Sequence, residues 1–588
     1  MQKSVLGYNW SASIIDEYFV NELTKYLQIS DFLARLLSRR VGSPEEAFHF
    51  LNPKIKSMLP DPFHLLDMEN GVKRTIEAIN NREKICIFAD YDVDGATSSA
   101  LLKNIFKELG IDIDIYVPDR IEEGYGPTSA AMQKLKDRKV DLLITVDCGS
   151  VAFEALNHAA EIGMDVIVID HHISLDQFPK AVAVINPNRI DETSIHKNLA
   201  AVGVSFLFSI ALCSILRKEG FFEKNGLSFP DLMKQLDLVA LGTVCDVMTL
   251  TGLNRAFVAQ GLKIARNRTN VGYAALCDIS ELTEAINCYH LGFVIGPRIN
   301  AGGRIGDSSL GAALLSTRNY QQASEISKEL DVHNNNRRAI ESVILEEAYM
   351  IAESQANNSI IFVSGKGWHP GVIGIVAGRL KEKYNKPVAV IAVNDSIGKG
   401  SCRSVKGCDF GKALIEAKSN DLLIAGGGHA MAAGFTICET KMPMLQGFLS
   451  ERFARIMKDS TSHLEQYYEM DLSPASLDEG LIEDMNLLEP FGNGNPAPVF
   501  KISNLFVLKA DIVGGKHIKV IFAPIRHSYS SKSISAIAFN AVNTAIAEII
   551  LSKKSHNLSV FGSLKLNNWQ NNQSLQLQIK DLVVEGFR

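Results

Sequence analysis

Short apolar runs alternate with helix-like segments between residues 84 and 190. Segments such as TSSALLKNIFKELG (97–110) separate the runs and repeat apolar residues at a helical spacing. Strands of a parallel sheet are buried on both faces, so their sequences are continuous apolar runs rather than alternating patterns. Alternation of such runs with helices is typical of a parallel α/β sheet. Five runs predict its strands: KICIFAD (84–90), IDIDIYV (111–117), DLLITVD (141–147), MDVIVID (164–170) and AVAVINP (181–187).

In the rest of the chain the pattern of apolar and polar residues changes at several points, which predicts further domains. The charged segment 316–354 has helical periodicity and neither proline nor glycine, as expected of a long helix between two lobes. A second α/β pattern follows it, and from about 466 short strand-like runs are typical of a small barrel. We expect five parts: an N-terminal helical region (1–80), a first α/β domain (81–310) that is mostly helical from 195, a connecting helix (311–356), a second α/β lobe (357–455) and a C-terminal β-barrel (466–588).

Composition narrows the class of protein. A chain of 588 residues has room for three to four domains of about 150 residues each. Its net charge of −6 excludes a generally basic nucleic-acid coat, so contacts with phosphate must come from local basic patches. Nine cysteines without a CxxC pair favour a reduced, cytoplasmic protein without disulfides or a zinc site. We expect no secretory signal, because the N-terminal residues lack its hydrophobic core, and we expect the uncharged stretch 198–216 to be a buried core helix rather than a membrane span.

Acidic residues end the apolar runs. In the first α/β domain they are Asp90, Asp92 and Asp94 of IFADYDVDGAT, Asp147, Asp170 with His171 and His172 behind it, and Asp246 after LDLVALGTVC. Ligands of an open α/β sheet bind outside the carboxyl ends of its strands. If all four runs are neighbouring parallel strands, their acids converge at one edge of the sheet.

Converging carboxylates repel one another unless some are neutral or a cation lies between them. Carboxylates with a few imidazoles suit Mg²⁺ or Mn²⁺, and two such ions are a known arrangement for phosphoryl displacement. Each acid taken alone has a structural alternative, since Asp after a strand often caps a helix and Asp-Gly often forms a turn. The four acidic ends together with the paired histidines favour the metal site.

The motifs DYDVDG, VDCG, DHH and GTVCD resemble those of the DHH phosphoesterase superfamily. GKGSCRS and GGGHAMAAGF resemble the associated DHHA1 domain, while GPRINAGGRIGD and EPFGNGNPAPVF are similar to the RecJ branch of single-stranded-DNA exonucleases. The resemblance covers about residues 40 to 585. It implies two α/β lobes (a DHH domain and a DHHA1 domain) joined by a long helix, and a C-terminal OB-fold. It also implies 5′→3′ degradation of single-stranded DNA in repair and recombination with two divalent cations, Mn²⁺ or Mg²⁺.

The resemblance also assigns roles in the first lobe. Asp92 and Asp94 match paired metal ligands, and Asp147 matches an acid that bridges two metals. His171 matches a metal ligand, and Asp246 matches the acid of the fourth motif. His172 is similar to a residue that faces the scissile phosphate. Members of the superfamily often have a histidine at the position that Phe88 occupies in this chain. Asp90 is therefore a candidate metal ligand in place of that histidine.

The second lobe offers phosphate ligands. Ser401 and Arg403 combine a hydroxyl with a guanidinium, and Arg298 and Arg304 of GPRINAGGR are candidates to join them. The Gly-rich turn with Gly427, Gly428 and His429 exposes backbone amides that can approach an anion. The resemblance implies that Arg304, Ser401 and Arg403 read a 5′ phosphate. In the barrel, the candidates for contact with the strand are Lys516, His517, Lys519, Phe539 and Trp569.

Two other functions fit parts of the pattern. One is a DHH-type phosphodiesterase of short oligonucleotides or cyclic dinucleotides, which the barrel region disfavours. The other is a non-catalytic single-strand-binding scaffold, which the intact acids disfavour. We expect single-stranded DNA as substrate, a single-strand-binding protein and a helicase as partners, a monomer, and no membrane. The metal used in the cell, the processivity and the preference for DNA over RNA stay open.

Overall fold

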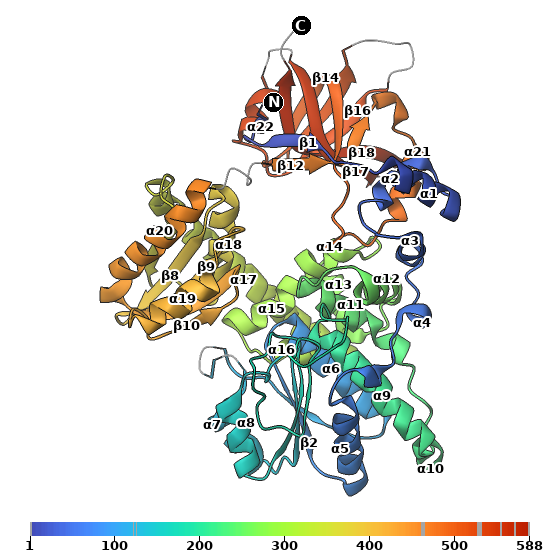
Figure 1. The fold of residues 1–588 in the computed structure, drawn as a ribbon, viewed down its shortest axis with the longest axis vertical. Coiled ribbons are helices and arrows are strands. Elements are labelled where there is room, and N and C mark those ends of the chain that lie inside the picture. The colour runs from blue at the N-terminus through green and yellow to red at the C-terminus, as the bar shows by residue number, and fades with distance from the viewer. Residues whose placement is uncertain are drawn as a thin grey trace. The chain divides into compact units, whose positions relative to one another are not determined.

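The computed structural model describes residues 3–120, 123–124, 126–459, 465–525, 532–552, 556–569 and 572–585. The chain forms two compact units (Figure 1). The first consists of Met1–Leu59, Val247–Gln260 and Leu464–Arg588, and the second of Pro60–Asp246 and Gly261–His463. The expected N-terminal region (1–80) is therefore divided between the units, and the expected first domain (81–310) is interrupted.

A five-stranded parallel sheet forms the first lobe of the second unit. Its order is β3 (Asp114–Tyr116), β2 (Ile85–Ala89), β4 (Leu142–Val146), β5 (Asp165–Ile169), β6 (Ala183–Ile185). The predicted runs all form strands, and β2 and β4 are buried along their whole length. The prediction of a parallel α/β sheet is confirmed.

Helices surround this sheet and extend the lobe. The first group is α5 (Met68–Asn81), α6 (Val93–Glu108), α7 (Ser129–Asp137), α8 (Phe153–Glu161), α9 (Ala201–Lys218), α10 (Phe221–Asn225) and α11 (Leu236–Cys245). Buried side chains of α7 and α8 share one core with the sheet. Helix α9 is long and apolar enough to cross a membrane, but it packs on α6 and 72% of it is buried. The expectation of a core helix at 198–216 is confirmed.

A helical segment leads from the first lobe to the second. It contains α13 (Val271–Ile279), α14 (Cys288–His290), a π-helical turn (Leu291–Ile295), α15 (Gly296–Ile305), α16 (Leu310–Ser316) and α17 (Tyr320–Glu353). Helix α17 is the long connecting helix expected at 311–356. It begins later because Asn319 caps it by accepting hydrogen bonds from the amides of Gln321 and Gln322.

The second lobe has a mixed five-stranded sheet. Its order is β10 (Ala425–Gly428), β11 (Ala432–Cys438), β9 (Ile397–Arg403), β8 (Val388–Asn394), β7 (Ile361–Lys366), and only β7 and β8 are parallel. Helices α17 and α18 (Ile373–Tyr384) bury one face of the sheet. Helices α19 (Phe410–Ser419) and α20 (Met442–Asp459) bury the other. The expected Gly-rich turn before His429 is instead the edge strand β10.

The first unit is built around a closed barrel. Strands β14 (Phe500–Val513), β15 (His517–Pro524), β16 (Ile534–Ala538), β18 (Asn572–Glu585) and β17 (Asn557–Trp569) pair in that order, and β17 pairs with β14 to close the ring. Helices α1 (Glu17–Leu27), α2 (Asp31–Leu37), α3 (Pro44–Leu51), α21 (Glu479–Asn486) and α22 (Ala545–Ile550) share its core. This unit also contains strands β1 (Asn9–Ala12), β12 (Glu465–Tyr468) and β13 (Met470–Leu472) and helix α4 (Ile55–Met58). The 15-residue α12 (Gly252–Arg266) spans the unit boundary. The predicted barrel is confirmed.

Candidate active site

Three acids lie side by side at the carboxyl edge of the first sheet. Ala89 of β2 is paired with Val146 of β4, and Val146 with Ile169 of β5. The next residue of each strand is an aspartate: Asp90, Asp147 and Asp170. The backbone amide of Asp147 still donates to the carbonyl of Ile169 at 3.0 Å, so the pairing continues to the acids. The parallel register thus brings these three acids together, as the sequence predicted.

The turn from β2 into α6 places two further acids. Oδ1 of Asp92 accepts hydrogen bonds from the amides of Asp94 (2.8 Å) and Gly95 (3.2 Å), which caps the helix. A Cβ at Gly95 would lie 2.2 Å from the carbonyl oxygen of Asp90. Only glycine therefore lets the helix start so close to the end of the strand.

Asp94 is held by the start of helix α9. Its two carboxylate oxygens accept hydrogen bonds from the amides of Ala201 (2.7 Å) and Val202 (2.9 Å). Burial, and after it the charge of Asp92, raise the pKa of Asp94 to about 7. The helix terminus stabilises a carboxylate that its surroundings otherwise disfavour.

Asp246 follows a helix and not a strand, which corrects the expectation of four strand ends. It caps the C-terminus of α11. Nearly every side chain of this helix is buried, so its sequence shows no helical period and resembles a buried strand. Oδ2 of Asp246 nevertheless lies 3.5 Å from Nε2 of His171, so the acid reaches the same site.

His171 lies at the centre of the acids. Its Nε2 is 3.2 Å from Oδ1 of Asp147 and 3.8 Å from Oδ2 of Asp94. Three groups of possible ligand atoms each lie within 4.8 Å of one another: Asp94 with His171 and Asp246, Asp90 with Asp92 and Asp147, and Asp147 with His171 and His172. We call the residues of the first two groups the acidic cluster: Asp90, Asp92, Asp94, Asp147, His171 and Asp246.

The electrostatics of the acidic cluster suit divalent cations. Burial raises the pKa of Asp90 and of Asp147 well above the usual range, with the charge of Asp92 the next cause for both. Burial and the charge of Asp94 raise the pKa of Asp246 to about 8. Oδ1 of Asp90 is buried and accepts no hydrogen bond from any residue that the structure describes. Five carboxylates and one imidazole are an oxygen-rich donor set that fits Mg²⁺ or Mn²⁺.

Asp170 orients the histidine pair. Its Oδ1 lies 2.8 Å from Nδ1 of His172 and accepts the amides of both histidines, while Oδ2 accepts the amide of Ser150 at 3.0 Å. Burial lowers the pKa of His172, but the hydrogen bond to Asp170 and the charges of the nearby carboxylates together outweigh burial and raise the value to about 9. Burial, followed by the charge of His172, lowers the pKa of His171 to about 4. At neutral pH His171 is therefore uncharged and able to bind a metal, whereas His172 is a cation.

A cavity of about 570 Å³ joins the two lobes of the second unit, and we call it the acidic cavity. The first lobe contributes Asp90, Asp92 and His172. The second contributes Ser401, Arg403, Gly428 and His429, and Arg304 lies between them. Except for Gly427 and Arg298, the residues predicted to bind phosphate therefore face the acidic cluster.

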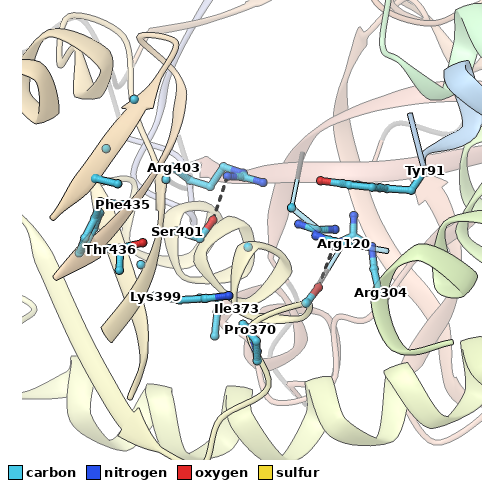
Figure 2. A pocket seen from close by; sticks show the side chains of 18 residues that line it. Tyr91, Arg120, Arg304, Pro370, Ile373, Lys399, Ser401, Arg403, Phe435 and Thr436 are labelled. Carbon is cyan, nitrogen blue, oxygen red and sulfur yellow. Dashed lines mark hydrogen bonds between the residues drawn. The ribbon is translucent and has the colours of Figure 1, made fainter. Parts of the chain in front are cut away.

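A second cavity of about 530 Å³, the basic cavity, shares Tyr91, Arg120, Arg304, Ser401 and Arg403 with the acidic cavity and is drawn in Figure 2. Gly427 lines it. Nη1 of Arg304 donates to the carbonyl of Gly371 at 3.0 Å, and burial lowers the pKa of this arginine to about 10.

Arg298 has a different place. Its Nε lies 2.9 Å from Oδ1 of Asp331 and its Nη1 donates to the carbonyl of Val294. It lines neither the acidic nor the basic cavity. The arginine that the sequence did not indicate is Arg120, whose guanidinium stacks 4.9 Å from the ring of Tyr91 in both cavities. Its position directly after the run IDIDIYVPD was the available signal, since loops after strands form such sites.

The barrel residues form a small exposed group. The rings of His517 and Phe539 meet edge to face at 5.2 Å, and Phe539 is 52% exposed, so it is not part of the core. Lys516 and Lys519 are exposed beside His517. The side chain of Trp569 lies outside the described residues.

Known proteins match the chain along most of its length. The DHH family N-terminal domain matches residues 84–243, the DHHA1 domain 357–455 and the RecJ OB domain 468–581. The single-stranded-DNA-specific exonuclease RecJ of Salmonella typhimurium is 35% identical, with 93% of this chain and 94% of that protein aligned. RecJ of Escherichia coli is 34% identical, with 94% and 96% aligned.

A solved structure agrees with these relatives. RecJ of Thermus thermophilus in complex with Mn²⁺ superimposes with a TM-score of 0.80 at 27% identity, covering 98% of this chain and 80% of that one. The chain belongs to the RecJ family of DHH phosphoesterases.

Proposed function

We propose that the chain is a single-stranded-DNA-specific exonuclease that degrades strands from the 5′ end, releases 5′-mononucleotides and acts in DNA repair and recombination. The observation that carries the proposal is the acidic cavity, where the acidic cluster faces Arg304, Ser401 and Arg403. RecJ relatives are named for this activity, and a solved RecJ structure contains Mn²⁺.

The acidic cluster would hold two divalent cations, Mn²⁺ or Mg²⁺. Asp147 belongs to the group with Asp90 and Asp92, and it also lies 3.2 Å from His171 of the other group, so it would help to hold both ions. Two bound cations stabilise both the attacking and the leaving oxygen of an in-line displacement. Asp90, whose buried Oδ1 accepts no hydrogen bond from a described residue, is a ligand of this site in our proposal.

The remaining residues bind and orient the strand. His172, held as a cation by Asp170, lines the acidic cavity and donates a hydrogen bond to the scissile phosphate. Arg304, Arg403 and Ser401 bind the 5′ phosphate, because guanidinium and hydroxyl donors suit phosphate oxygens. Gly427 and Gly428 leave their backbone accessible to the strand, with His429 beside them. Arg120 joins this set.

The arrangement of these groups explains why degradation would start at the 5′ end. When the arginines bind the terminal phosphate, the next phosphodiester lies at the acidic cluster. A strand without an end has no terminal phosphate for the arginines to bind. The barrel adds a surface with exposed Lys519 and Phe539 that can contact single-stranded bases.

The wider biological setting is part of the same proposal. We place the enzyme in the cytoplasm as a monomer that works with a single-strand-binding protein and a helicase. A phosphodiesterase of short oligonucleotides needs no barrel, and a non-catalytic scaffold needs no acidic cluster.

The test is a degradation assay in Mn²⁺ with end-labelled single-stranded DNA, single-stranded RNA and blunt duplex DNA. We expect loss of single-stranded DNA and sparing of the duplex. Asp147→Ala should abolish cleavage but retain strand binding, while Asp112→Ala, an exposed acid of the same lobe, should leave cleavage unchanged. Absence of cleavage by the wild-type protein, or internal cuts, would refute the proposal.

A further inference from the structure

The basic cavity extends past the residues that a 5′ monophosphate needs. Ser401 and Arg403 lie at the end of β9, and Lys399 lies two residues before Ser401. Alternate residues of a strand share a face, so Lys399, Ser401 and Arg403 form one row, about 6.5–7 Å apart from residue to residue. Figure 2 shows the three side chains projecting from β9 toward the cavity, with Arg120 and Arg304 across from them. Lys399 does not line the acidic cavity.

Beside Ser401 and Lys399, the wall of the basic cavity includes glycines that have no side chain to fill the space. Gly434 of β11 is paired with Ser401 and with Gly427 of β10, and Thr436 is paired with Lys399. A Cβ at Gly427 would meet nothing within 4 Å, and one at Gly434 would meet only a carbonyl oxygen at 3.6 Å. Bare backbone therefore leaves room for an anion along the row, with the hydroxyl of Thr436 at its far end.

The charge of the basic cavity exceeds that of a single phosphate. Its cations are Arg120, Arg304, Lys399 and Arg403, and none of its 18 lining residues is acidic. Across the described residues, none of the four forms an ion pair with a carboxylate. A terminal monophosphate has about two negative charges. A longer chain of phosphates matches the four cations better.

We propose that the basic cavity accepts a 5′-polyphosphate end of the strand, with Lys399 and Thr436 binding the phosphates beyond the first. The inference rests on the proposed function, because the α-phosphate occupies the site of the 5′ monophosphate. The distance from the α- to the γ-phosphorus of a triphosphate is similar to the distance between neighbouring residues of the row, such as Ser401 and Lys399. The terminal nucleotide then keeps its normal position at the acidic cluster.

The chemistry of the first turnover differs only in its product. Water forms a bond to the phosphorus between the first and second nucleotides, and the bond from that phosphorus to the 3′ oxygen of the first nucleotide breaks. The leaving 3′ oxygen takes up a proton. The first product is a nucleoside 5′-triphosphate, the shortened strand keeps a 5′ monophosphate, and later turnovers release mononucleotides.

The experiment compares three forms of one DNA strand, bearing a 5′ hydroxyl, a 5′ monophosphate or a 5′ triphosphate labelled at the γ position. We expect the triphosphate strand to be degraded at a rate similar to the monophosphate strand and its label to appear in a nucleoside triphosphate. Lys399→Ala should slow the triphosphate strand by about tenfold and leave the monophosphate strand nearly unchanged. The matched control is Lys418→Ala, which removes an exposed lysine from helix α19 of the same lobe.

The outcomes are separable. If the monophosphate strand is degraded and the triphosphate strand is not, or if its label leaves as inorganic phosphate or pyrophosphate, this inference is overturned while the proposed function stands. Equal losses on both strands in Lys399→Ala also overturn it. If no strand is degraded, the proposed function itself fails. A competition arm with dATP and dAMP distinguishes a free nucleotide: inhibition by dATP without degradation of the triphosphate strand would assign the cavity to the free nucleotide and overturn the assignment to a strand end.

Discussion

Nδ1 of His172 lies 2.8 Å from Oδ1 of Asp170, the acid that follows strand β5 directly. This contact fixes the ring and directs Nε2 away from Asp170. Together with the charges of the nearby carboxylates, it raises the pKa of His172 to about 9 despite burial, so the imidazole is a cation at neutral pH. An acid outside the acidic cluster thus fixes the orientation and charge of the histidine that we propose contacts the scissile phosphate.

Asp170→Asn should weaken this control. A neutral amide no longer favours the imidazolium, so the pKa of His172 falls. In our proposal the protonated form is the active one, so activity in the wild type should decline as the pH rises through about 9, and in the variant it should decline at lower pH. We expect a rate loss of about 10- to 100-fold at neutral pH. The measurement is the pH–rate profile, with Asp165→Asn at the exposed start of the same strand as control. An unchanged basic limb would contradict the assignment.

Gly95→Ala should damage the site without removing a ligand. The added methyl would lie 2.2 Å from the carbonyl oxygen of Asp90, so the strand end and the start of α6 must separate. We expect the affinity for Mn²⁺, measured by calorimetric titration, to fall by about tenfold or more. Gly378→Ala on α18 is the control, since its Cβ would meet nothing within 4 Å. Wild-type affinity in Gly95→Ala would show that the close approach is not required.

Cation binding should remove a pH dependence of stability. The folded pKa values of Asp94 and Asp246, about 7 and 8, lie above the unfolded value of 3.8. The folded protein then binds more protons between these values, so stability falls as the pH rises from about 4 to 8 and is lowest above that window. Thermal unfolding in a chelator should give a higher Tm at about pH 6 than at about pH 8. Mn²⁺ should raise the Tm most at the higher pH. The same pH dependence with and without Mn²⁺ would contradict the clustered acids.

Arg403→Ala should discriminate between strand ends. The guanidinium lines both cavities and donates to the carbonyl of Cys402 at 2.8 Å, which holds it beside Ser401. We expect a loss of about 10- to 100-fold on strands with a 5′ phosphate and a smaller loss on strands with a 5′ hydroxyl. Arg455→Ala, an exposed arginine of α20, is the control. Equal losses on both substrates would refute the role in phosphate binding.

Much of the fold was readable from the sequence, because buried parallel strands are continuous apolar runs. The runs at 85–89 and 142–146 form β2 and β4, and their acids meet because the strands pair in register. The same continuous apolar pattern gave a wrong prediction at 236–245, where a strand was expected and a helix is found. Helix α11 is buried nearly all round, so nothing in its pattern distinguishes it from a strand before Asp246.

The details of the site depended on contacts between distant segments. Arg298 is paired with Asp331, 33 residues away on another helix, and no local pattern indicates such a partner. Arg120 reaches the cavities from a loop whose path is set by the tertiary structure. The need for glycine at position 95 comes from the close approach of the start of α6 to the carbonyl oxygen of Asp90, which only the tertiary structure reveals.

The central claim is that cleavage starts at a bound 5′ end beside the acidic cluster. The most direct test is one time course in Mn²⁺ with a single-stranded DNA labelled in parallel at its 5′ or its 3′ end, alongside a circular single strand. The account predicts that 5′ label appears at once as a mononucleotide, that 3′ label appears only after the strand has been shortened, and that the circle is not cut. Early release of the 3′ label, or cleavage of the circle, would contradict it.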